Sequence, residues 1–289
     1  MKKIDVIISV ATKDCLIVQK NLQYIYENLN SDNIYILTNL SNTRLFNTQV
    51  LQKYNAILID ENKLIEGLSF QNIHSIVSKI YPKYNLTGWY FQQFLKMGFA
   101  LSQYAKEDYL IWDADTFPLH KLTFKQNNKY FFTIKSEYHK PYFSCIKKIL
   151  NMEKSINGSF IAEHMIINSS VMKELIKDIS QSSCTGNNWI EKILNSVDST
   201  ATNGFSEFET YGTYVTIKYP NLYEHRKLRT NRNAGNLYGR GVTKSQLKNL
   251  SNSYDTVSFE EGDTPPFPKS LIHYFTKIYL RLWVILNKK

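Results

Sequence analysis

The sequence has 289 residues, 43% of them hydrophobic, and a formal net charge of +10. This length and composition allow one large core or two small ones. The chain shows no Pro/Gly/Ser-rich linker, internal repeat or low-complexity tract, so we expect one elaborated domain over residues 1–289. The three cysteines are too few and too scattered for a disulfide framework or a zinc site, which indicates a reducing compartment. The N-terminus does not resemble a signal peptide, and we expect a cytoplasmic protein.

Strands and helices alternate along the first part of the chain. Apolar runs predict strands at residues 2–10, 34–37, 56–59 and 109–112, and a helical pattern covers about 16–28. This alternation is typical of an α/β protein with a parallel sheet flanked by helices. Ligands of such sheets bind at the carboxyl ends of the strands.

The fourth predicted strand ends in two carboxylates, Asp113 and Asp115. In an extended segment, residues two apart lie on the same side, close enough to share one divalent cation. A cation with oxygen ligands would neutralise the repulsion between them. The sequence therefore predicts a Mg²⁺ or Mn²⁺ site that holds a diphosphate. The alternative is a solvated loop that begins at a strand end.

Basic residues are spread along the chain, with one local concentration at residues 225–232, after the strand-like run 214–217. The segment is either a binding site for an anionic ligand or lipid pyrophosphate, a solvated basic loop, or a nucleic-acid contact. No nucleic-acid-binding motif accompanies it. We therefore expect no nucleic-acid partner.

The C-terminal run 271–286 is dense in aromatic and aliphatic residues. It is shorter than the ~20 apolar residues of a membrane span, and Lys277 and Arg281 interrupt it. Its pattern fits an amphipathic helix in the membrane interface, or a terminal helix docked on the core. We expect peripheral contact with the membrane at most.

Residues 113–116 also match the Asp-x-Asp-x-Thr nucleophile motif of haloacid-dehalogenase-like phosphatases. That family carries the motif on its first strand and needs a later acidic pair for magnesium. Here at least three predicted strands precede the motif, and the later segment 262–266 lacks a second acid. The phosphatase is kept as an alternative.

Five segments resemble a bacterial family of predicted GT-A glycosyltransferases that is catalogued as a domain of unknown function. They lie within residues 4 to 232 and are Gly88–Lys96, Trp112–Thr116, Pro141–Phe143, Ser159–Met165 and Phe205–Gly212. The resemblance implies a GT-A-like nucleotide-diphospho-sugar transferase fold, with a Rossmann-like mixed sheet flanked by helices. Residues 1–120 would form the nucleotide-binding half, 121–250 the acceptor and catalytic half, and 251–289 a C-terminal extension with the amphipathic helix.

The implied activity is metal-dependent transfer of a sugar from a nucleotide-diphosphate donor, with a UDP-sugar expected first. The acceptor would be a glycan or polyprenyl-linked molecule in surface-polysaccharide synthesis of the capsule or O-antigen type. Such an enzyme would act at the inner face of the cytoplasmic membrane. A non-catalytic sugar-binding protein on the same fold is the third possibility.

The resemblance also implies roles for residues on the donor side. Asp115 is expected to bind Mn²⁺ or Mg²⁺ directly, and Asp113 to bind the metal, its water or the ribose. His273 is the expected third metal ligand, with a packed histidine as the alternative. Lys13 and Asp14 follow the first strand, where GT-A folds bind the nucleotide.

Two acids of the segment Ser206–Glu209 are the candidate catalytic residues. Glu207 would act as the base on the acceptor hydroxyl, and Glu209 would orient it or a sugar hydroxyl. The alternative has Ser206 as an N-cap, with both acids favoured in the first helical turn by the helix dipole. The following residues 210–215 fit either a helix or a strand.

The remaining candidates concern the sugars. Trp89 and Gln93 open a predicted helix and suit donor recognition, although core packing is the alternative. Glu163 and His164 lie in an apolar run at 160–167 that predicts a strand, and we expect them to bind the donor sugar or the acceptor. A buried, hydrogen-bonded histidine is the other interpretation. Arg226 is the candidate anion-binding residue of the basic segment.

Overall fold

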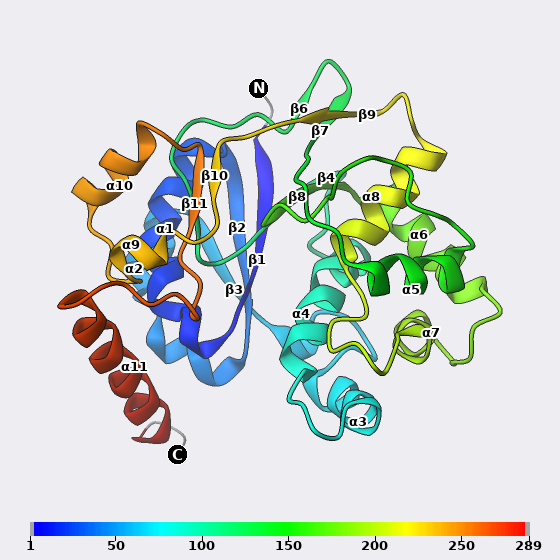
Figure 1. The fold of residues 1–289 in the computed structure, drawn as a ribbon, viewed down its shortest axis with the longest axis horizontal. Coiled ribbons are helices and arrows are strands. Elements are labelled where there is room, and N and C mark those ends of the chain that lie inside the picture. Colours follow the sequence, from blue (N-terminus) through cyan, green and yellow to red (C-terminus); the bar gives the residue numbers. More distant parts are fainter. Residues whose placement is uncertain (1–2, 287–289) are drawn as a thin grey trace. The chain divides into compact units, whose positions relative to one another are not determined.

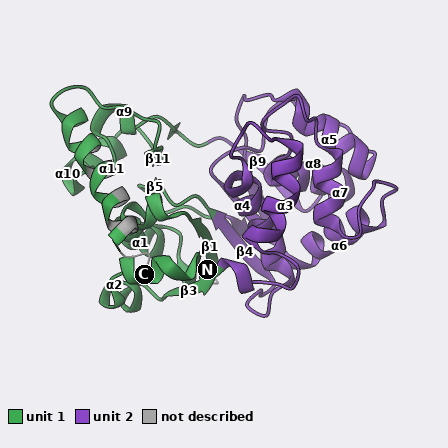
Figure 2. Cartoon of the chain, turned by 90° about the horizontal axis from the view of Figure 1, so that it is seen from below, with its two compact units in different colours: residues 1–60, 112–123, 228–289 green, residues 61–111, 124–227 purple. Residues whose placement is uncertain are grey.

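The structure is a computed structural model that describes residues 3–286, except the side chains of residues 273, 276, 277, 280, 281 and 283–285. The chain forms two compact units (Figure 2). Unit 1 comprises residues 1–60, 112–123 and 228–289, and unit 2 comprises residues 61–111 and 124–227. These boundaries differ from the division at residues 120 and 250 expected from the sequence, and the single domain stays a prediction.

Unit 1 begins with three neighbouring parallel strands, β1 (Ile4–Val10), β2 (Ser31–Thr38) and β3 (Ala56–Asp60) (Figure 1). In their register, Ile8 pairs with Ile36, which pairs with Leu58. The 3₁₀ helix η1 (Thr12–Asp14) and helix α1 (Cys15–Asn28) connect β1 to β2, and η2 (Leu40–Leu45) and α2 (Thr48–Lys53) connect β2 to β3. The strands and the helix predicted for this region are confirmed.

A second sheet in unit 1 has the order β10 (Thr230–Asn231), β11 (Thr256–Ser258) and β5 (Thr116–Pro118). Strands β10 and β11 are parallel, and β11 and β5 are antiparallel. Helices α9 (Gly235–Tyr238) and α10 (Lys244–Ser251) lie between β10 and β11 along the chain. This part has its own apolar core, formed by Ile17, Phe117, Ala234, Val242, Leu247, Leu250, Val257 and Phe259. Far C-terminal residues therefore complete the core around α1.

The C-terminal run forms helix α11 (Lys269–Leu286), as predicted. Several of its large apolar side chains are exposed, among them Ile272, Phe275 and Leu286. Within the described residues, none of the helices has the length and apolar content needed to cross a membrane. Contact with a membrane surface stays a prediction from the sequence.

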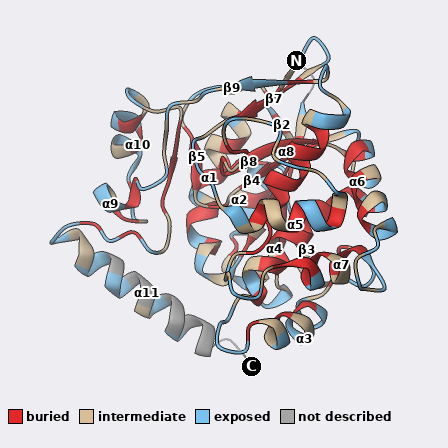
Figure 3. Cartoon of the chain, turned by 45° about the vertical axis from the view of Figure 1, so that its right-hand side comes forward, coloured by how far each residue is buried: buried red, intermediate tan, exposed pale blue. Residues whose placement is uncertain are grey.

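Unit 2 contains the remaining elements. Its helices are α3 (Phe70–Ile80), α4 (Thr87–Gly98), α5 (Lys140–Leu150), α6 (Ser169–Gln181), α7 (Trp189–Ser196) and α8 (Glu207–Lys218), with 3₁₀ helices η3 (Glu61–Lys63) and η4 (Phe99–Leu101). Strand β4 (Asp108–Trp112) neighbours β8 (His164–Asn168), and a separate sheet has the order β6 (Lys125–Gln126), β7 (Lys129–Thr133) and β9 (Tyr223–Arg226). Most residues of β8 and α8 are buried (Figure 3).

Two predictions for unit 2 need correction. The run 214–217, which looked strand-like, belongs to helix α8, because Ser206 caps that helix by accepting a hydrogen bond from the Glu209 backbone N–H. The strand predicted over 160–167 begins only at His164. Glu163 before it has a left-handed backbone with φ of 56°, which ends the extended conformation.

Candidate functional site

The carboxylates of the Asp-x-Asp segment lie in a turn of unit 1, not in an extended strand. The Thr116 backbone N–H donates to the Asp113 carbonyl over 3.1 Å, which closes the turn before β5. The Asn21 side chain of α1 donates to the Thr116 carbonyl at 2.6 Å and so holds the end of the turn against α1. The Asp115 carbonyl accepts from the Phe259 N–H at 3.1 Å. The prediction that both carboxylates share one side of an extended segment is therefore wrong, because Ala114 and Asp115 form a turn between the two strands.

Four carboxylates nevertheless influence one another in this region, and we call them the carboxylate cluster: Asp14, Asp113, Asp115 and Glu260. Burial, together with the negative charges of Asp14 and Asp113, raises the pKa of Asp115 to about 8. Glu260 acts in the same direction, while Arg240 opposes it. Burial and the neighbouring carboxylates together thus outweigh the opposing effect of Arg240 on the pKa of Asp115.

The positive groups beside the cluster come from the start of η1 and the loop after α9. The Arg240 guanidinium donates to an Asp14 carboxylate oxygen and, over 3.1 Å, to the Lys13 carbonyl. The Lys13 ammonium pairs with Glu261 at 2.9 Å. The predicted nucleotide residues Lys13 and Asp14 are therefore held in place by the C-terminal part of unit 1.

The composition of the carboxylate cluster fits a hard divalent cation. Within the described residues, no group of three or more His, Cys, Asp or Glu side chains is arranged to hold a metal by itself. Mg²⁺ and Mn²⁺ sites commonly use one or two carboxylates, with phosphate oxygens of the substrate and water as further ligands. A cation at Asp115 and Asp113 would relieve the repulsion that raises the pKa of Asp115. His273 lies within α11, and its side chain is outside the described part of the chain.

In unit 2, the predicted base Glu207 forms a buried ion pair. Its carboxylate accepts from the Lys96 ammonium at 2.9 Å, and each side chain is 6% exposed. The Gln93 side-chain oxygen accepts from the Glu207 backbone N–H at 3.1 Å. Gln93 is itself buried, whereas Trp89, one turn earlier on α4, is half-buried. The structure thus joins Gln93 of α4 to Glu207 at the start of α8.

The second candidate acid, Glu209, is hydrogen-bonded to the segment before β8. One carboxylate oxygen accepts from the Ser159 hydroxyl at 2.5 Å and from the Phe160 N–H at 3.2 Å. The other oxygen is buried and has no hydrogen bond within the described residues. Burial raises the pKa of Glu209, and the two hydrogen bonds offset part of this effect. Glu209 therefore holds the conformation of residues 159 and 160.

The raised pKa of Glu209 predicts a pH-dependent contribution to stability. The protonated form is favoured in the folded state, so this contribution is complete below the unfolded pKa near 4.5 and is lost as the pH rises through the folded pKa. As the pH rises from 4.5 to 8, the wild type should lose this contribution and Glu209→Gln should not, so the free energy of unfolding of Glu209→Gln should rise relative to that of the wild type. Urea unfolding at both pH values measures this. A difference between the two proteins that does not change with pH would contradict the ionisation assigned to Glu209.

The predicted sugar-binding residues form a second polar cluster in unit 2. Glu163 accepts from the Lys135 ammonium at 2.7 Å, and His164 pairs with the Thr133 hydroxyl at 2.8 Å. Burial lowers the pKa of His164 well below its usual value, and the charges of Arg226 and Lys135 act in the same direction. The imidazole is therefore neutral at neutral pH.

Arg226 belongs to the same cluster. Its Nε donates to the Thr133 hydroxyl over 3.4 Å, and the guanidinium lies 4.4 Å from the centre of the Phe124 ring. The left-handed backbone of Glu163 is costly for a residue with a side chain, and such strain is concentrated at functional sites. Arg226, predicted from the basic segment, is thus brought together with the pair Glu163 and His164.

Three residues beside the predicted sites were missed. Lys96 is the one charged residue of α4 and stands among mainly buried residues, which is a sequence signal for a buried ion pair. Arg240 stands between Gly239 and Gly241, a less specific signal. Lys135 follows an apolar strand and gives no signal that we can identify.

A family model matches residues 1–250 and describes a family of unknown function, DUF6492. The chain is a member of the DUF6492 family. No curated protein matches this DUF6492 chain by sequence.

Solved glycosyltransferases share the fold of the DUF6492 chain. The bifunctional glycosyltransferase WbbM in its apo form is similar with a TM-score of 0.50 and 13% identity, over 95% of this chain and 51% of the WbbM chain. The DUF6492 chain thus spans about half the length of that protein.

Two further structures are less similar. Mouse xyloside xylosyltransferase 1 has a TM-score of 0.46 and 10% identity, with 89% of this chain and 97% of the other covered. The galactosyltransferase LgtC, in complex with donor and acceptor sugar analogues, has a TM-score of 0.46 and 10% identity, with 96% and 95% covered. Scores below 0.5 add nothing to the assignment. The DUF6492 chain has a GT-A-type glycosyltransferase fold, and its strands, helices and sheets agree with the fold class predicted from the sequence.

Proposed function

We propose that this DUF6492 protein is a metal-dependent glycosyltransferase that uses a nucleotide-diphosphate sugar. The observation that carries the proposal is the carboxylate cluster on a GT-A-type fold, where burial and neighbouring acids raise the pKa of Asp115 to about 8. A diphosphate cannot bind such a cluster directly, because both are negative. A divalent cation between them removes the conflict.

On the donor side, Asp115 and Asp113 would hold Mn²⁺ or Mg²⁺, and the cation would stabilise the charge on the leaving diphosphate. Asp14, fixed by Arg240, and Lys13 are suited to hydrogen-bond the nucleotide. UDP is the nucleotide that we propose first. His273 remains the proposed third metal ligand.

On the acceptor side, Glu163, His164 and Arg226 would bind hydroxyl groups of the transferred or accepting sugar. The donor sugar would also contact Trp89 and Gln93. The burial of Glu207 and Glu209 favours positioning for both acids. Glu207 anchors α8 to Lys96, and Glu209 fixes the segment before Glu163. Direct base catalysis by Glu207 would require the Lys96 pair to open. We propose a glycan or polyprenyl-linked acceptor and a role in surface-polysaccharide synthesis at the inner face of the membrane.

The experiment that tests the proposal is a hydrolysis screen of UDP-, GDP-, dTDP- and CMP-sugars with Mn²⁺. We expect slow release of the nucleotide from one donor, because water replaces the acceptor in such assays. This release should be lost in EDTA, because EDTA removes the cation that stabilises the leaving diphosphate. A donor that binds without release would indicate a non-catalytic sugar-binding protein. Release of phosphate from phosphate monoesters, with a trapped aspartyl-phosphate, would instead indicate the phosphatase.

A further inference from the structure

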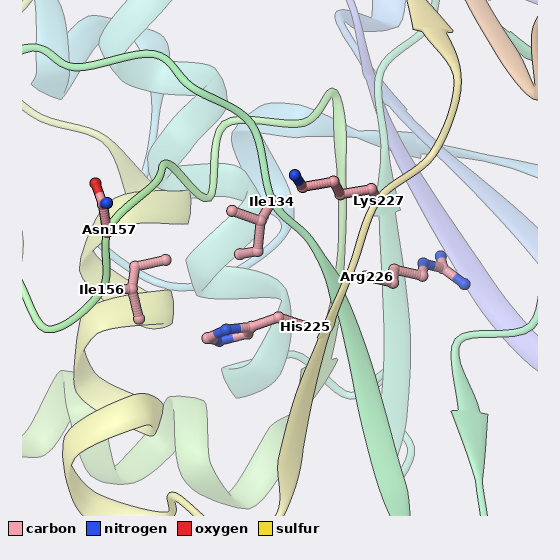
Figure 4. A pocket seen from close by; sticks show the side chains of 6 residues that line it. All are labelled: Ile134, Ile156, Asn157, His225, Arg226 and Lys227. Carbon is pink, nitrogen blue, oxygen red and sulfur yellow. The ribbon is translucent and has the colours of Figure 1, made fainter.

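A cavity of about 400 Å³ opens in unit 2 beside strand β9, lined by Ile134, Ile156, Asn157, His225, Arg226 and Lys227. His225 and Lys227 point toward Ile134 and Ile156, whereas Arg226 points the opposite way (Figure 4). This follows from strand geometry, since residues two apart share a face. The Arg226 side chain thus lies toward Glu163 and His164, whereas His225 and Lys227 line the cavity.

The wall of the cavity depends on a glycine. Gly158 follows Asn157, and a Cβ atom there would lie 2.5 Å from a methyl carbon of Ile134. Without that atom, the segment 156–158 can lie close to β7, and the Lys135 N–H bonds the Ser159 carbonyl at 2.9 Å. Ser159 is in turn held by Glu209. The cavity is therefore built by the same contacts that fix the predicted acceptor side.

Apart from Arg226, the polar side chains of this cavity make few contacts with the described part of the protein. In the described part of the chain, neither Lys227 nor Asn157 makes a hydrogen bond or ion pair, and His225 makes a ring contact with Phe160. None of the six lining residues is acidic. An ammonium, an imidazole and an amide thus surround a space whose other wall is formed by two isoleucines.

We infer that this cavity binds an anionic group, a carboxylate or phosphate, of the sugar acceptor. Lys227 supplies the charge, Asn157 and His225 supply hydrogen-bond donors, and the isoleucine side chains contact the apolar face of a sugar ring. Burial lowers the pKa of His225, so the imidazole is a neutral partner before binding. Lys227 is the residue on which the anion depends.

The inference rests on the proposed function and deepens it by naming the acceptor class. The donor diphosphate is assigned to the carboxylate cluster, which lies wholly in unit 1 and requires a cation. The cavity lies wholly in unit 2, carries a lysine and has no acid in its lining. The cavity is therefore suited to bind an anionic group of the acceptor directly, without a bridging metal ion.

Calorimetry on the full-length protein tests this with three probes: methyl glucuronide, glucose 6-phosphate and the neutral methyl glucoside. We expect binding of at least one acidic probe, none of the neutral probe, and an affinity about tenfold lower in Lys227→Gln, because a charge-assisted hydrogen bond is lost. Lys227→Arg should keep most of the affinity. Lys173→Gln, which removes an exposed lysine of α6, is the matched control and should bind as the wild type does.

The acidic probe that binds identifies the source of the charge as a sugar carboxylate or a phosphate ester. Equal binding of the neutral probe, or full affinity in Lys227→Gln, would overturn the inference. A loss of UDP–Mn²⁺ affinity in Lys227→Gln would also overturn it, since the cavity would then hold the donor. In each of these cases, metal-dependent hydrolysis of the nucleotide-sugar would still support the proposed function.

Discussion

Asp115→Asn is expected to lower metal-dependent hydrolysis of the nucleotide-sugar by about 10²- to 10³-fold. The substitution keeps the shape of the side chain and its turn, but it removes the carboxylate that we assign as a direct metal ligand. Without the cation, the diphosphate meets the negative charges of Asp14, Asp113 and Glu260. Initial rates at saturating Mn²⁺ measure the effect, with Asp113→Asn beside it.

The matched control for this prediction is Glu27→Gln, which removes one exposed carboxylate at the end of α1 in the same unit. It should leave the rate of hydrolysis unchanged, because solvent and salt screen a single exposed charge from the bound diphosphate. If Asp115→Asn retained the wild-type rate while still requiring Mn²⁺, the metal would bind elsewhere. The carboxylate cluster would then have another role.

Lys96→Met is expected to destabilise the protein by about 3–5 kcal/mol, because it leaves the Glu207 carboxylate buried without its cation. The two side chains are 6% exposed each, so water cannot replace the lost partner. Urea unfolding at pH 7 measures the loss. The double variant Lys96→Met/Glu207→Gln should recover most of the stability, since it removes the charge as well as its partner.

The double variant also separates two roles for Glu207. If the double variant is stable and still hydrolyses the donor, Glu207 positions α8 and is not the base. A rate lower by about 10²-fold or more would instead indicate that Glu207 is the catalytic base. A cost below about 1 kcal/mol for Lys96→Met would contradict the buried pair, because only exposed pairs are that weak.

The first three strands and the helix α1 could be predicted because each carries a local pattern. Apolar runs such as Ile34–Leu37 read directly as buried strands, and the N-cap Ser206 with acids in the next turn is a local signal for a helix. The signal at Ser206 competes with the β-propensity of Tyr214–Ile217. The Ser206 N-cap and the close packing of Gly212 against Phe160 stabilise the helix over this propensity.

The partners of the site residues could not be predicted, because they come from distant parts of the chain. Arg240 reaches Asp14 across 226 positions, and Lys96 reaches Glu207 across 111. No periodicity connects such positions. The turn at Asp113–Asp115 was missed for a similar reason, since the contact of Asn21 that holds it comes from α1. The sequence therefore indicates which residues carry chemistry better than it indicates their surroundings.

A calorimetric titration of the protein with UDP, in Mn²⁺ and again in EDTA, tests the central claim most directly. A cation between Asp115 and the diphosphate predicts binding in Mn²⁺ and an affinity at least about tenfold lower in EDTA. The same affinity in both buffers would remove the metal from the site and contradict the account.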